Sequence, residues 1–219
     1  DNQGPEQVKN VKCIAVDGTT ATLSWSDVSD DDISYFVVEC KQSDGVWKSV
    51  SRTSTNLGVN LSGLTPEHDY VYRVIGYDKR SNRGTPSEEI TVTTLKDTIC
   101  PKVTKITPDP GYFKSEINLR FTAEDDYRVK SIEIQTSTDK ESWKTVSEIK
   151  ATGESAKCTF DCKLDLKNYE EGSVFVRAKV YDSYGNVTEN KDLTCYEYVV
   201  DRTAPIQPTG VTVSSGETE

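Results

Sequence analysis

Oxygen-bearing side chains that could hold a cation recur at three places from residue 97 onward. They are Asp97, Glu124, Asp125, Asp126, Asp182 and Asn186. Hard cations such as Ca²⁺ take several oxygen ligands from carboxylates and amides, so these residue types suit that chemistry. The twelve-residue spacing of an EF-hand is absent, and Asp and Asn also serve as ordinary turn formers. These residue types alone therefore fit both interpretations, cation ligands and turn formers.

The first half contains a parallel set of the same residue types. Its members are Asp30, Asp31, Asp32, Asp78 and Asn82. The order is the same in both halves, because an acidic run is followed about 50 residues later by an Asp and an Asn four residues apart. The same two interpretations, cation ligands and turn formers, apply to this set.

Catalytic chemistry has little support in the sequence. The chain has one histidine, His68, which lies between Pro66 and Tyr70 in a turn-like stretch. A catalytic histidine would need a Ser or Cys nucleophile beside it, and the sequence contains no GxSxG, HExxH or Cys-x-x-Cys motif. We therefore expect no catalytic residues and a protein that is not an enzyme.

Composition excludes several classes of partner. The 219 residues carry a formal net charge of −10, which repels nucleic acids and anionic membrane surfaces. No apolar stretch approaches the roughly 18 residues of a membrane-spanning helix. The chain begins at Asp1 without a signal peptide, which we interpret as a piece of a longer precursor.

Alternating apolar residues predict short strands in the first half. The alternation is clear at Ala21–Trp25, Phe36–Cys40, Tyr70–Gly76 and Ile90–Val92. Asp44-Gly45 is a hairpin signal between the second and third of these features. Short strands separated by turn signals are typical of a β-sandwich, and no segment has the 3.6-residue period of a helix.

The second half repeats this pattern. We expect strands at Ile117–Phe121, at Val129–Ile134 with an irregularity, at Cys158–Leu164, at Val174–Val180 and near Cys195–Val200. Trp143 closes a hairpin after Asp139-Lys140. The sequence therefore predicts an all-β fold made of two tandem sandwiches.

A recurring Asp-x-x-x-Pro motif marks the expected boundaries. It occurs at Asp1–Pro5, Asp97–Pro101 and Asp201–Pro205, at intervals of 96 and 104 residues. Each interval is the size of one sandwich domain, and proline stiffens the chain as a junction requires. The stretches SDGVWKSVS (43–51) and DKESWKTVS (139–147) are also alike. We therefore expect domains at 1–96 and 97–202, followed by a linker and the start of another repeat at 203–219.

Residues 5–94 resemble a fibronectin type III domain. The resemblance rests on Pro5 before Val11, on the stretches TATLSW and YFVVEC, and on LTPEHDYVYRV and TPSEEITVTT. Leu64, Pro66 and Tyr70 match the tyrosine-corner motif of the family, in which a phenol hydroxyl bonds back to the main chain. The resemblance implies a seven-stranded sandwich with that corner.

Residues 97–205 resemble a bacterial Ig-like domain. The resemblance rests on DTICP, FTAEDDYRV, SWKTV, VYDSYGNVTE and VVDRTAP. In this topology, the loops after the second and sixth strands lie at the same pole as the N-terminus. The resemblance therefore implies that the acidic groups meet there, at the domain junction. The calcium ligands we predict are Asp97, Asp125, Asp126, Asp182 and Asn186.

The six cysteines leave the redox state open. Cys158 and Cys162 lie on one predicted strand about 13 Å apart, too far for a disulfide, whose Cα atoms lie within about 7 Å. The others are Cys13, Cys40, Cys100 and Cys195. Buried free thiols and disulfides both fit these positions.

The organisation favours a spacer or scaffold segment of a secreted or cell-surface protein. We expect a monomer whose partners are neighbouring domains of the same parent protein. The alternative is an adhesion module for a glycan or a host or matrix protein. Its candidate contacts are the basic turn 78–85 and the aromatic residues Tyr112, Phe113, Tyr127 and Tyr184. Core or edge packing is the competing role for these rings.

Overall fold

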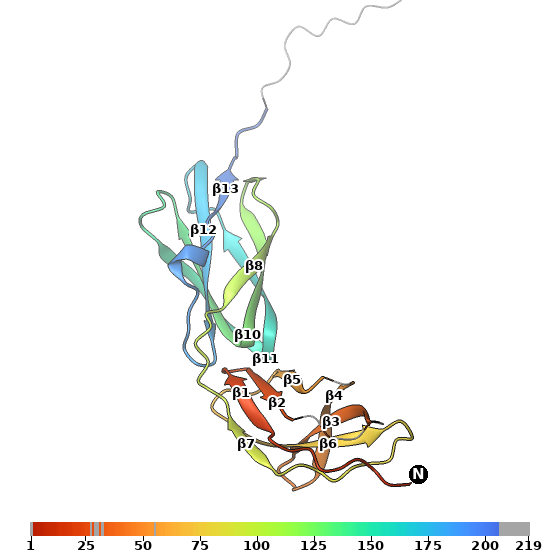
Figure 1. Cartoon of the computed structure of the whole chain (residues 1–219). Coiled ribbons are helices and arrows are strands. Elements are labelled where there is room, and N and C mark those ends of the chain that lie inside the picture. The colour runs from red at the N-terminus through yellow and green to blue at the C-terminus, as the bar shows by residue number, and fades with distance from the viewer. Residues whose placement is uncertain (1, 27, 29–30, 32, 55, 206–219) are drawn as a thin grey trace, which may run out of the picture.

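The chain folds into two groups of β-strands around two separate hydrophobic cores. The computed structural model describes residues 2–26, 28, 31, 33–54 and 56–205 (Figure 1). Within these residues, the only helix is a single 3₁₀ turn, η1 (Asn190–Asp192), and no helix is long and apolar enough to cross a membrane. The fold is therefore all-β, as predicted. The start of a further repeat, expected at 203–219, lies outside the described residues from 206 onward.

The N-terminal sandwich has the two sheets expected of seven short strands. One sheet has the order β1-β2-β5, and the other has the order β4-β3-β6-β7. The strands are β1 (Lys12–Val16), β2 (Thr20–Ser24), β3 (Ile33–Lys41), β4 (Trp47–Thr53), β5 (Gly58–Ser62), β6 (Asp69–Asp78) and β7 (Ile90–Thr93). Their inward residues form one core, in which the rings of Trp25 and Phe36 pack edge-on at 5.6 Å.

The tyrosine corner of the N-terminal sandwich is present. The Tyr70 hydroxyl accepts a hydrogen bond from the main-chain N–H of Thr65 at 2.8 Å, and Leu64 and Pro66 are buried beside it. This bond fixes the connection into β6 at the point where the chain crosses between the sheets.

We expect Tyr70→Phe to lower the free energy of unfolding of the N-terminal sandwich by about 1 kcal/mol, because one intramolecular hydrogen bond is lost. Chemical denaturation measures the change. Tyr77→Phe, on the same strand, is the control, since Tyr77 acts through ring stacking on Tyr35 at 4.8 Å. Equal effects of the two variants would show that the corner contributes no stability.

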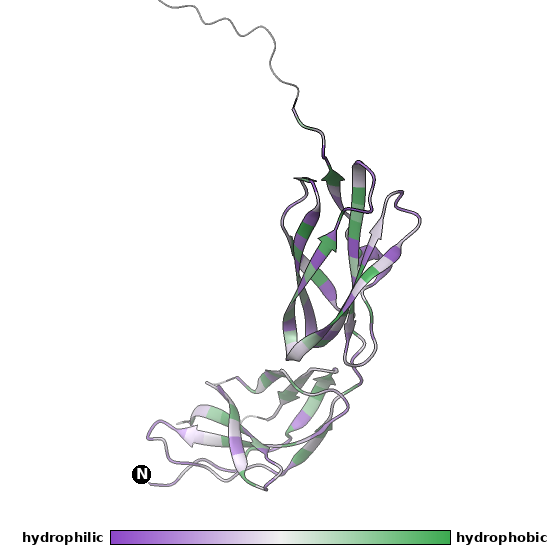
Figure 2. Cartoon of the chain, turned by 180° about the vertical axis from the view of Figure 1, so that it is seen from behind, coloured by the Kyte–Doolittle hydropathy of each residue, from purple (hydrophilic) through white to green (hydrophobic). Residues whose placement is uncertain are grey.

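The C-terminal sandwich is a single sheet that folds over on itself. Its order is β11-β10-β12-β13-β9, and β8 pairs with β10. The strands are β8 (Lys102–Thr107), β9 (Tyr112–Phe113), β10 (Glu116–Ser137), β11 (Lys144–Asp165), β12 (Gly172–Asp182) and β13 (Tyr196–Val200). Figure 2 shows apolar and polar residues alternating along these strands, which buries one face of each layer in the core.

Two strands expected to be separate are one long strand. Ile117–Phe121 and Val129–Ile134 both belong to β10, whose pairing with β11 slips between Glu124 and Val129. The first half of β10 pairs with β8, and the second half pairs with β12. The slip between Glu124 and Val129 is therefore a bend that carries the strand from one layer to the other, and the acidic run 124–126 lies at this bend rather than in a loop. The irregularity expected within Val129–Ile134 corresponds to the register shift between Val129 and Ser131.

Two strands of the C-terminal sandwich were missed. In β8, the inward residues Val103 and Ile106 are three apart, because the pairing with β10 slips between Thr122 and Ala123. A bulge of this kind breaks the period of two that reveals a strand in a sequence. The other missed strand, β9, has only two residues and pairs in parallel with β13.

The two similar hairpin stretches make the same contact. Arg73 stacks on the ring of Trp47 with its guanidinium carbon 4.0 Å from the ring centroid, and Arg177 stacks on Trp143 at 3.9 Å. The turn residues Gly45 and Lys140 both have positive φ, at 81° and 64°. The sequence likeness between 43–51 and 139–147 therefore reflects one hairpin built twice.

All six cysteines are free. Cys40 and Cys162 are buried, and burial raises the pKa of both thiols. Cys158 and Cys162 lie on the same strand, β11, as predicted. Of the two interpretations left open by the sequence, the structure favours free thiols, and the two buried ones pack as small apolar side chains.

Candidate metal site at the seam between the sandwiches

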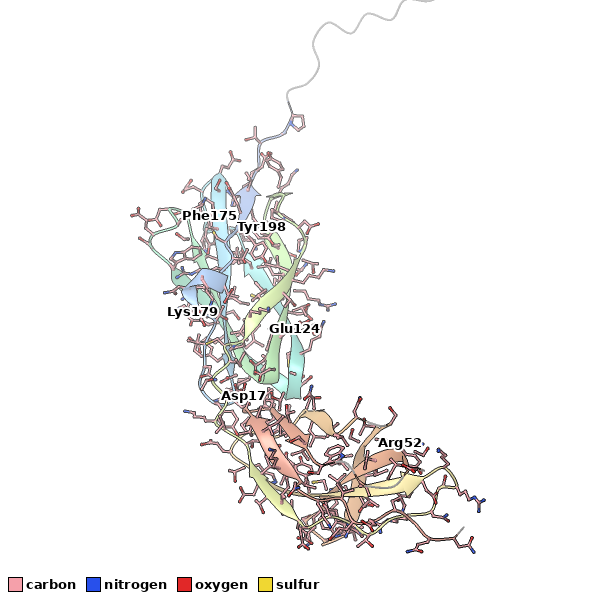
Figure 3. All side chains as sticks on the ribbon, viewed as in Figure 1. Asp17, Arg52, Glu124, Phe175, Lys179 and Tyr198 are labelled. Atoms are coloured by element: carbon pink, nitrogen blue, oxygen red, sulfur yellow. The ribbon has the colours of Figure 1, made fainter. Side chains whose placement is uncertain are left out.

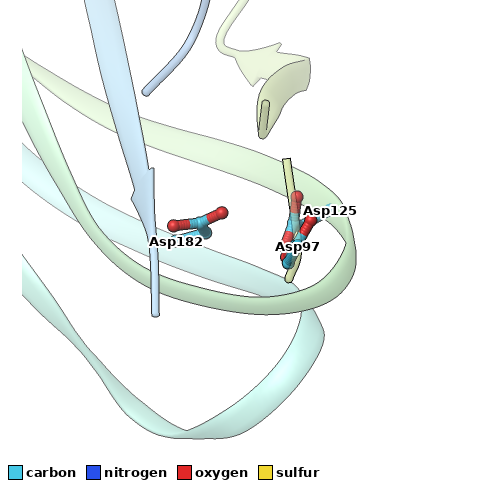
Figure 4. A group of neighbouring side chains, drawn as sticks. All are labelled: Asp97, Asp125 and Asp182. Carbon is cyan, nitrogen blue, oxygen red and sulfur yellow. The ribbon is translucent and has the colours of Figure 1, made fainter. Parts of the chain in front are cut away.

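Three aspartates from three different segments converge where the two sandwiches meet. Asp97 lies in the connection between β7 and β8, Asp125 at the bend of β10, and Asp182 at the end of β12. One carboxylate oxygen from each lies within 4.8 Å of those of the other two. Figure 4 shows Asp182 facing Asp97 and Asp125. Asp97 and Asp182 are buried, and Asp125 is half-buried.

Asp182 organises the turn that follows β12. Its Oδ1 accepts hydrogen bonds from the N–H groups of Tyr184 and Asn186, both at 2.8 Å, and its Oδ2 accepts one from Asn186 Nδ2 at 2.6 Å. The same turn follows β6, where Asp78 Oδ1 accepts the N–H of Asn82 at 2.7 Å and Oδ2 accepts Asn82 Nδ2 at 2.7 Å. Turn formation therefore explains the Asp-x-x-x-Asn spacing in both halves.

Asp97 has one bonded and one unpartnered oxygen. Its Oδ1 accepts the N–H of Ile99 at 2.9 Å, and Asp201 Oδ1 likewise accepts the N–H of Thr203 at 3.0 Å. The repeated Asp-x-x-x-Pro motif thus begins with the same turn at both places. The difference is in the surroundings, because Asp97 is 1% exposed and its Oδ2 is buried with no hydrogen-bond partner among the described residues.

Asp125 shows the same asymmetry. Its Oδ2 accepts the N–H groups of Tyr127 and Arg128, at 3.3 and 3.1 Å, which holds the β10 bend in place. Its Oδ1 is buried and has no partner within the described part of the chain. Two carboxylate oxygens at the seam are therefore desolvated without a donor.

The electrostatics of the cluster disfavour three ionised carboxylates. Burial, together with the negative charges of Asp97, Asp126 and Asp182, raises the pKa of Asp125 to about 6, although the hydrogen bond from the Tyr127 N–H lowers it. Burial also raises the pKa of Asp97, with contributions from Asp126, Asp182 and Asp17. Figure 3 places Asp17 at the end of the N-terminal sandwich that faces the C-terminal one. A cation at this position would relieve the repulsion.

Three other residues of the predicted acidic set have different roles. Asp126 is exposed, and its Oδ2 accepts a hydrogen bond from the Thr19 hydroxyl at 3.0 Å, which joins the two sandwiches. Asn186 Nδ2 donates to the main-chain oxygen of Asp97 at 3.2 Å as well as to Asp182. Glu124 forms an ion pair with Lys157. Asn186 therefore holds Asp97 and Asp182 together, whereas Asp126 and Glu124 interact with residues outside the cluster.

The seam has further contacts that the sequence did not reveal. The Tyr184 hydroxyl donates to the main-chain oxygen of Pro66 at 3.1 Å. Gly18 packs against the backbone of Asp97 so closely that a Cβ at this position would lie 3.2 Å from Asp97 Cα. Contacts of this kind depend on how two folded units meet, so the pattern of apolar residues in either unit does not predict them.

The parallel acidic set of the first half does not form a comparable cluster among the described residues. Asp78 and Asn82 make the turn after β6, and the main-chain oxygen of Asp31 accepts a hydrogen bond from Lys79 Nζ at 3.3 Å. Asp30 and Asp32 lie outside the described residues. The turn-former interpretation accounts for Asp78 and Asn82.

Packing accounts for most of the aromatic residues considered for sugar binding. Phe113 packs edge-on against Tyr198 in the C-terminal core at 5.8 Å, and Tyr127 and Tyr184 form a tilted pair at 5.8 Å beside the seam. Tyr112 is 75% exposed and is the one member of the four that is open to solvent. His68 lies exposed in its turn with its ring edge-on to Tyr70 at 4.8 Å.

Sequence comparison identifies the N-terminal sandwich. Residues 6–93 match the family model of the fibronectin type III domain. This stretch is less than half of the chain. Domains of this family are structural or binding modules of multidomain proteins, generally non-catalytic and common in extracellular or surface proteins. A search of curated proteins found no match.

Solved structures of the same fold are similar to parts of the chain. A fibronectin type III domain of human fibronectin type III domain containing protein 3 is 25% identical over 44% of this chain and 92% of its own, with a TM-score of 0.40. The FN1-FN3 domains of chicken CNTN1 are 15% identical over 90% of this chain and 68% of theirs, with a TM-score of 0.41. The FN5 domain of Drosophila Lar is 21% identical over 42% of this chain and 99% of its own, with a TM-score of 0.36.

Proposed function

We propose that this chain is a non-catalytic spacer of a larger secreted or cell-surface protein, in which two sandwiches are held at a fixed angle. A fibronectin type III domain at 1–96 is followed by an Ig-like domain at 97–202 of the kind found in bacterial modular proteins. The partners are the neighbouring domains of the parent protein, and the chain itself is a monomer. The net charge of −10 argues against a nucleic acid partner.

Hydrogen bonds across the seam, the region where the two sandwiches meet, support this proposal. Residues from both sandwiches bond directly across the seam, through Thr19 to Asp126 and through Tyr184 to Pro66. These bonds join segments that lie far apart in the sequence of each sandwich, so a rotation about the connection at Asp97 would break at least one of them. A fixed angle is what a spacer needs to present its neighbours at a constant distance and direction.

We expect the double variant Thr19→Val and Tyr184→Phe to loosen the seam without unfolding either sandwich, because the first change replaces a hydroxyl with a methyl group of similar size and the second removes a hydroxyl. Rotational correlation times from ¹⁵N relaxation measure the effect. The wild-type sandwiches should share one correlation time, and those of the variant should separate and shorten. Thr22→Val with Tyr77→Phe is the control, since both lie away from the seam.

The alternative function is that of an adhesion module, and binding experiments can distinguish it from a spacer. A glycan array and a panel of matrix proteins probed with the intact chain distinguish the two. We expect no saturable binding. Saturable binding that is lost in Tyr112→Ala, the exposed ring of the four candidates, would establish a binding module instead.

A further inference from the structure

Two buried carboxylate oxygens at the seam lack any donor, and this is costly in a folded protein. Asp97 Oδ2 and Asp125 Oδ1 have no hydrogen-bond partner among the described residues, and Asp97 is 1% exposed. An ionised oxygen removed from water loses its hydration unless a donor, a proton or a cation replaces it. Both oxygens belong to aspartates of the group that also contains Asp182.

We propose that Asp97, Asp125 and Asp182 bind one Ca²⁺ ion at the seam, with water completing its coordination. One oxygen from each residue already lies within 4.8 Å of the others. Calcium–oxygen distances of 2.3–2.6 Å allow two ligands of one ion to be up to about 5 Å apart. Small rotations of the side chains are therefore enough for the three carboxylates to reach a common ion.

Turn formation does not account for this arrangement. The turn after β6 uses Asp78 and Asn82 with the same bonds as Asp182 and Asn186, yet the described residues bring no pair of further carboxylates to Asp78. Asp201 repeats the turn of Asp97, and its carboxylate is not part of such a group either. Both turns therefore form elsewhere in the described chain without a cluster of carboxylates. The cluster at the seam also leaves Asp97 Oδ2 and Asp125 Oδ1 without a donor among the described residues.

Calcium suits this site better than magnesium because its coordination geometry is more tolerant. Magnesium holds its ligands at 2.0–2.1 Å in a near-ideal octahedron, so two of its ligands are at most about 4.2 Å apart. Calcium tolerates an irregular shell of carboxylates and water.

The ion would connect three segments that meet at the junction. Asp97 belongs to the connection between the sandwiches, and Asp125 neighbours Asp126, which contacts Thr19. Binding would therefore hold the β10 bend and the connection in one position. The site does not depend on the spacer role, because protein contacts alone could keep the seam rigid.

Thermal unfolding of the intact chain tests the proposal. After treatment with EDTA and its removal, we expect CaCl2 to raise the Tm by several degrees in a saturable manner, since a ligand that binds only the folded state stabilises it. The same concentration of MgCl2 should raise it less. Isothermal titration calorimetry with CaCl2 should give one site per chain. Equal Tm values in CaCl2 and in EDTA, with no heat of binding, would overturn the proposal.

Asparagine variants should lose the calcium response without losing stability in EDTA, a combination that a purely structural role of these aspartates does not produce. Asp97→Asn and Asp125→Asn should each abolish the calcium response, and in EDTA each should melt at or above the wild-type temperature, because a repelling buried charge is gone. Asp201→Asn, which alters the same turn at the other end of the sandwich, should keep the full calcium response. Retention of that response in both Asp97→Asn and Asp125→Asn would place any calcium elsewhere and refute this site.

Discussion

Phe121→Ala lowers the free energy of unfolding of the C-terminal sandwich by about 3–5 kcal/mol and leaves the N-terminal sandwich unchanged. Phe121 is fully buried in the core that the two halves of β10 share with β11 and β12. Truncation of a buried aromatic ring loses its transfer free energy and leaves a cavity that a close-packed core cannot collapse around. The N-terminal core contains no residue of this cluster, so its own packing is untouched.

Hydrogen exchange reports this change separately for each sandwich. The free energy of opening should fall for amides of β10 and β12 and stay constant for amides of β3 and β6. Tyr112→Ala, which also truncates an aromatic ring of the C-terminal sandwich but at a 75% exposed position, should change the same amides by less than about 0.5 kcal/mol. A loss of protection spread equally over both sandwiches would mean that the chain has one continuous core.

Thr188→Val lowers the stability of the C-terminal sandwich by about 2 kcal/mol although the side chain keeps its shape. The buried Thr188 Oγ1 accepts a hydrogen bond from the N–H of Val180 at 2.9 Å. The valine side chain cannot accept this bond, and a buried donor left without an acceptor costs about 1–3 kcal/mol. The N-terminal sandwich has the same device, since Ser87 Oγ accepts the N–H of Val74 at 2.9 Å.

The matched control is Thr188→Ser, which keeps the hydroxyl and loses a single methyl group at a cost of about 1 kcal/mol. Urea denaturation of the three proteins gives the comparison. If Thr188→Ser proves as destabilising as Thr188→Val, the methyl group and not the hydrogen bond is responsible.

The strands that alternate strictly were predictable from the sequence. The inward residues lie two apart over Phe36–Cys40 of β3, Tyr70–Gly76 of β6 and Val174–Val180 of β12, and these strands occur where their patterns placed them. Strand β8 was missed because a bulge places its inward residues Val103 and Ile106 three apart, which breaks the alternation. The irregularity within Val129–Ile134 was predicted, but local sequence does not show that Ile117–Phe121 and Val129–Ile134 form one strand, because continuity is decided by the partners β8 and β12.

The candidate site was predicted in part. Asp97, Asp125 and Asp182 converge as expected, since each lies at the end of a strand or at a bend near the junction. Asp126 was placed in the same set, but at this bend it faces Thr19. No pattern in the sequence indicated that Pro66 and Thr19 form contacts at the seam, because their partners belong to the other sandwich.

Residual dipolar couplings of the intact chain test most directly whether two sandwiches are held at a fixed angle. In a weakly aligning medium, couplings from the strands of both sandwiches should fit one alignment tensor, with the relative orientation seen in Figure 1. Two tensors that differ in magnitude would show that the sandwiches reorient independently, and the proposed spacer would then be a flexible tether.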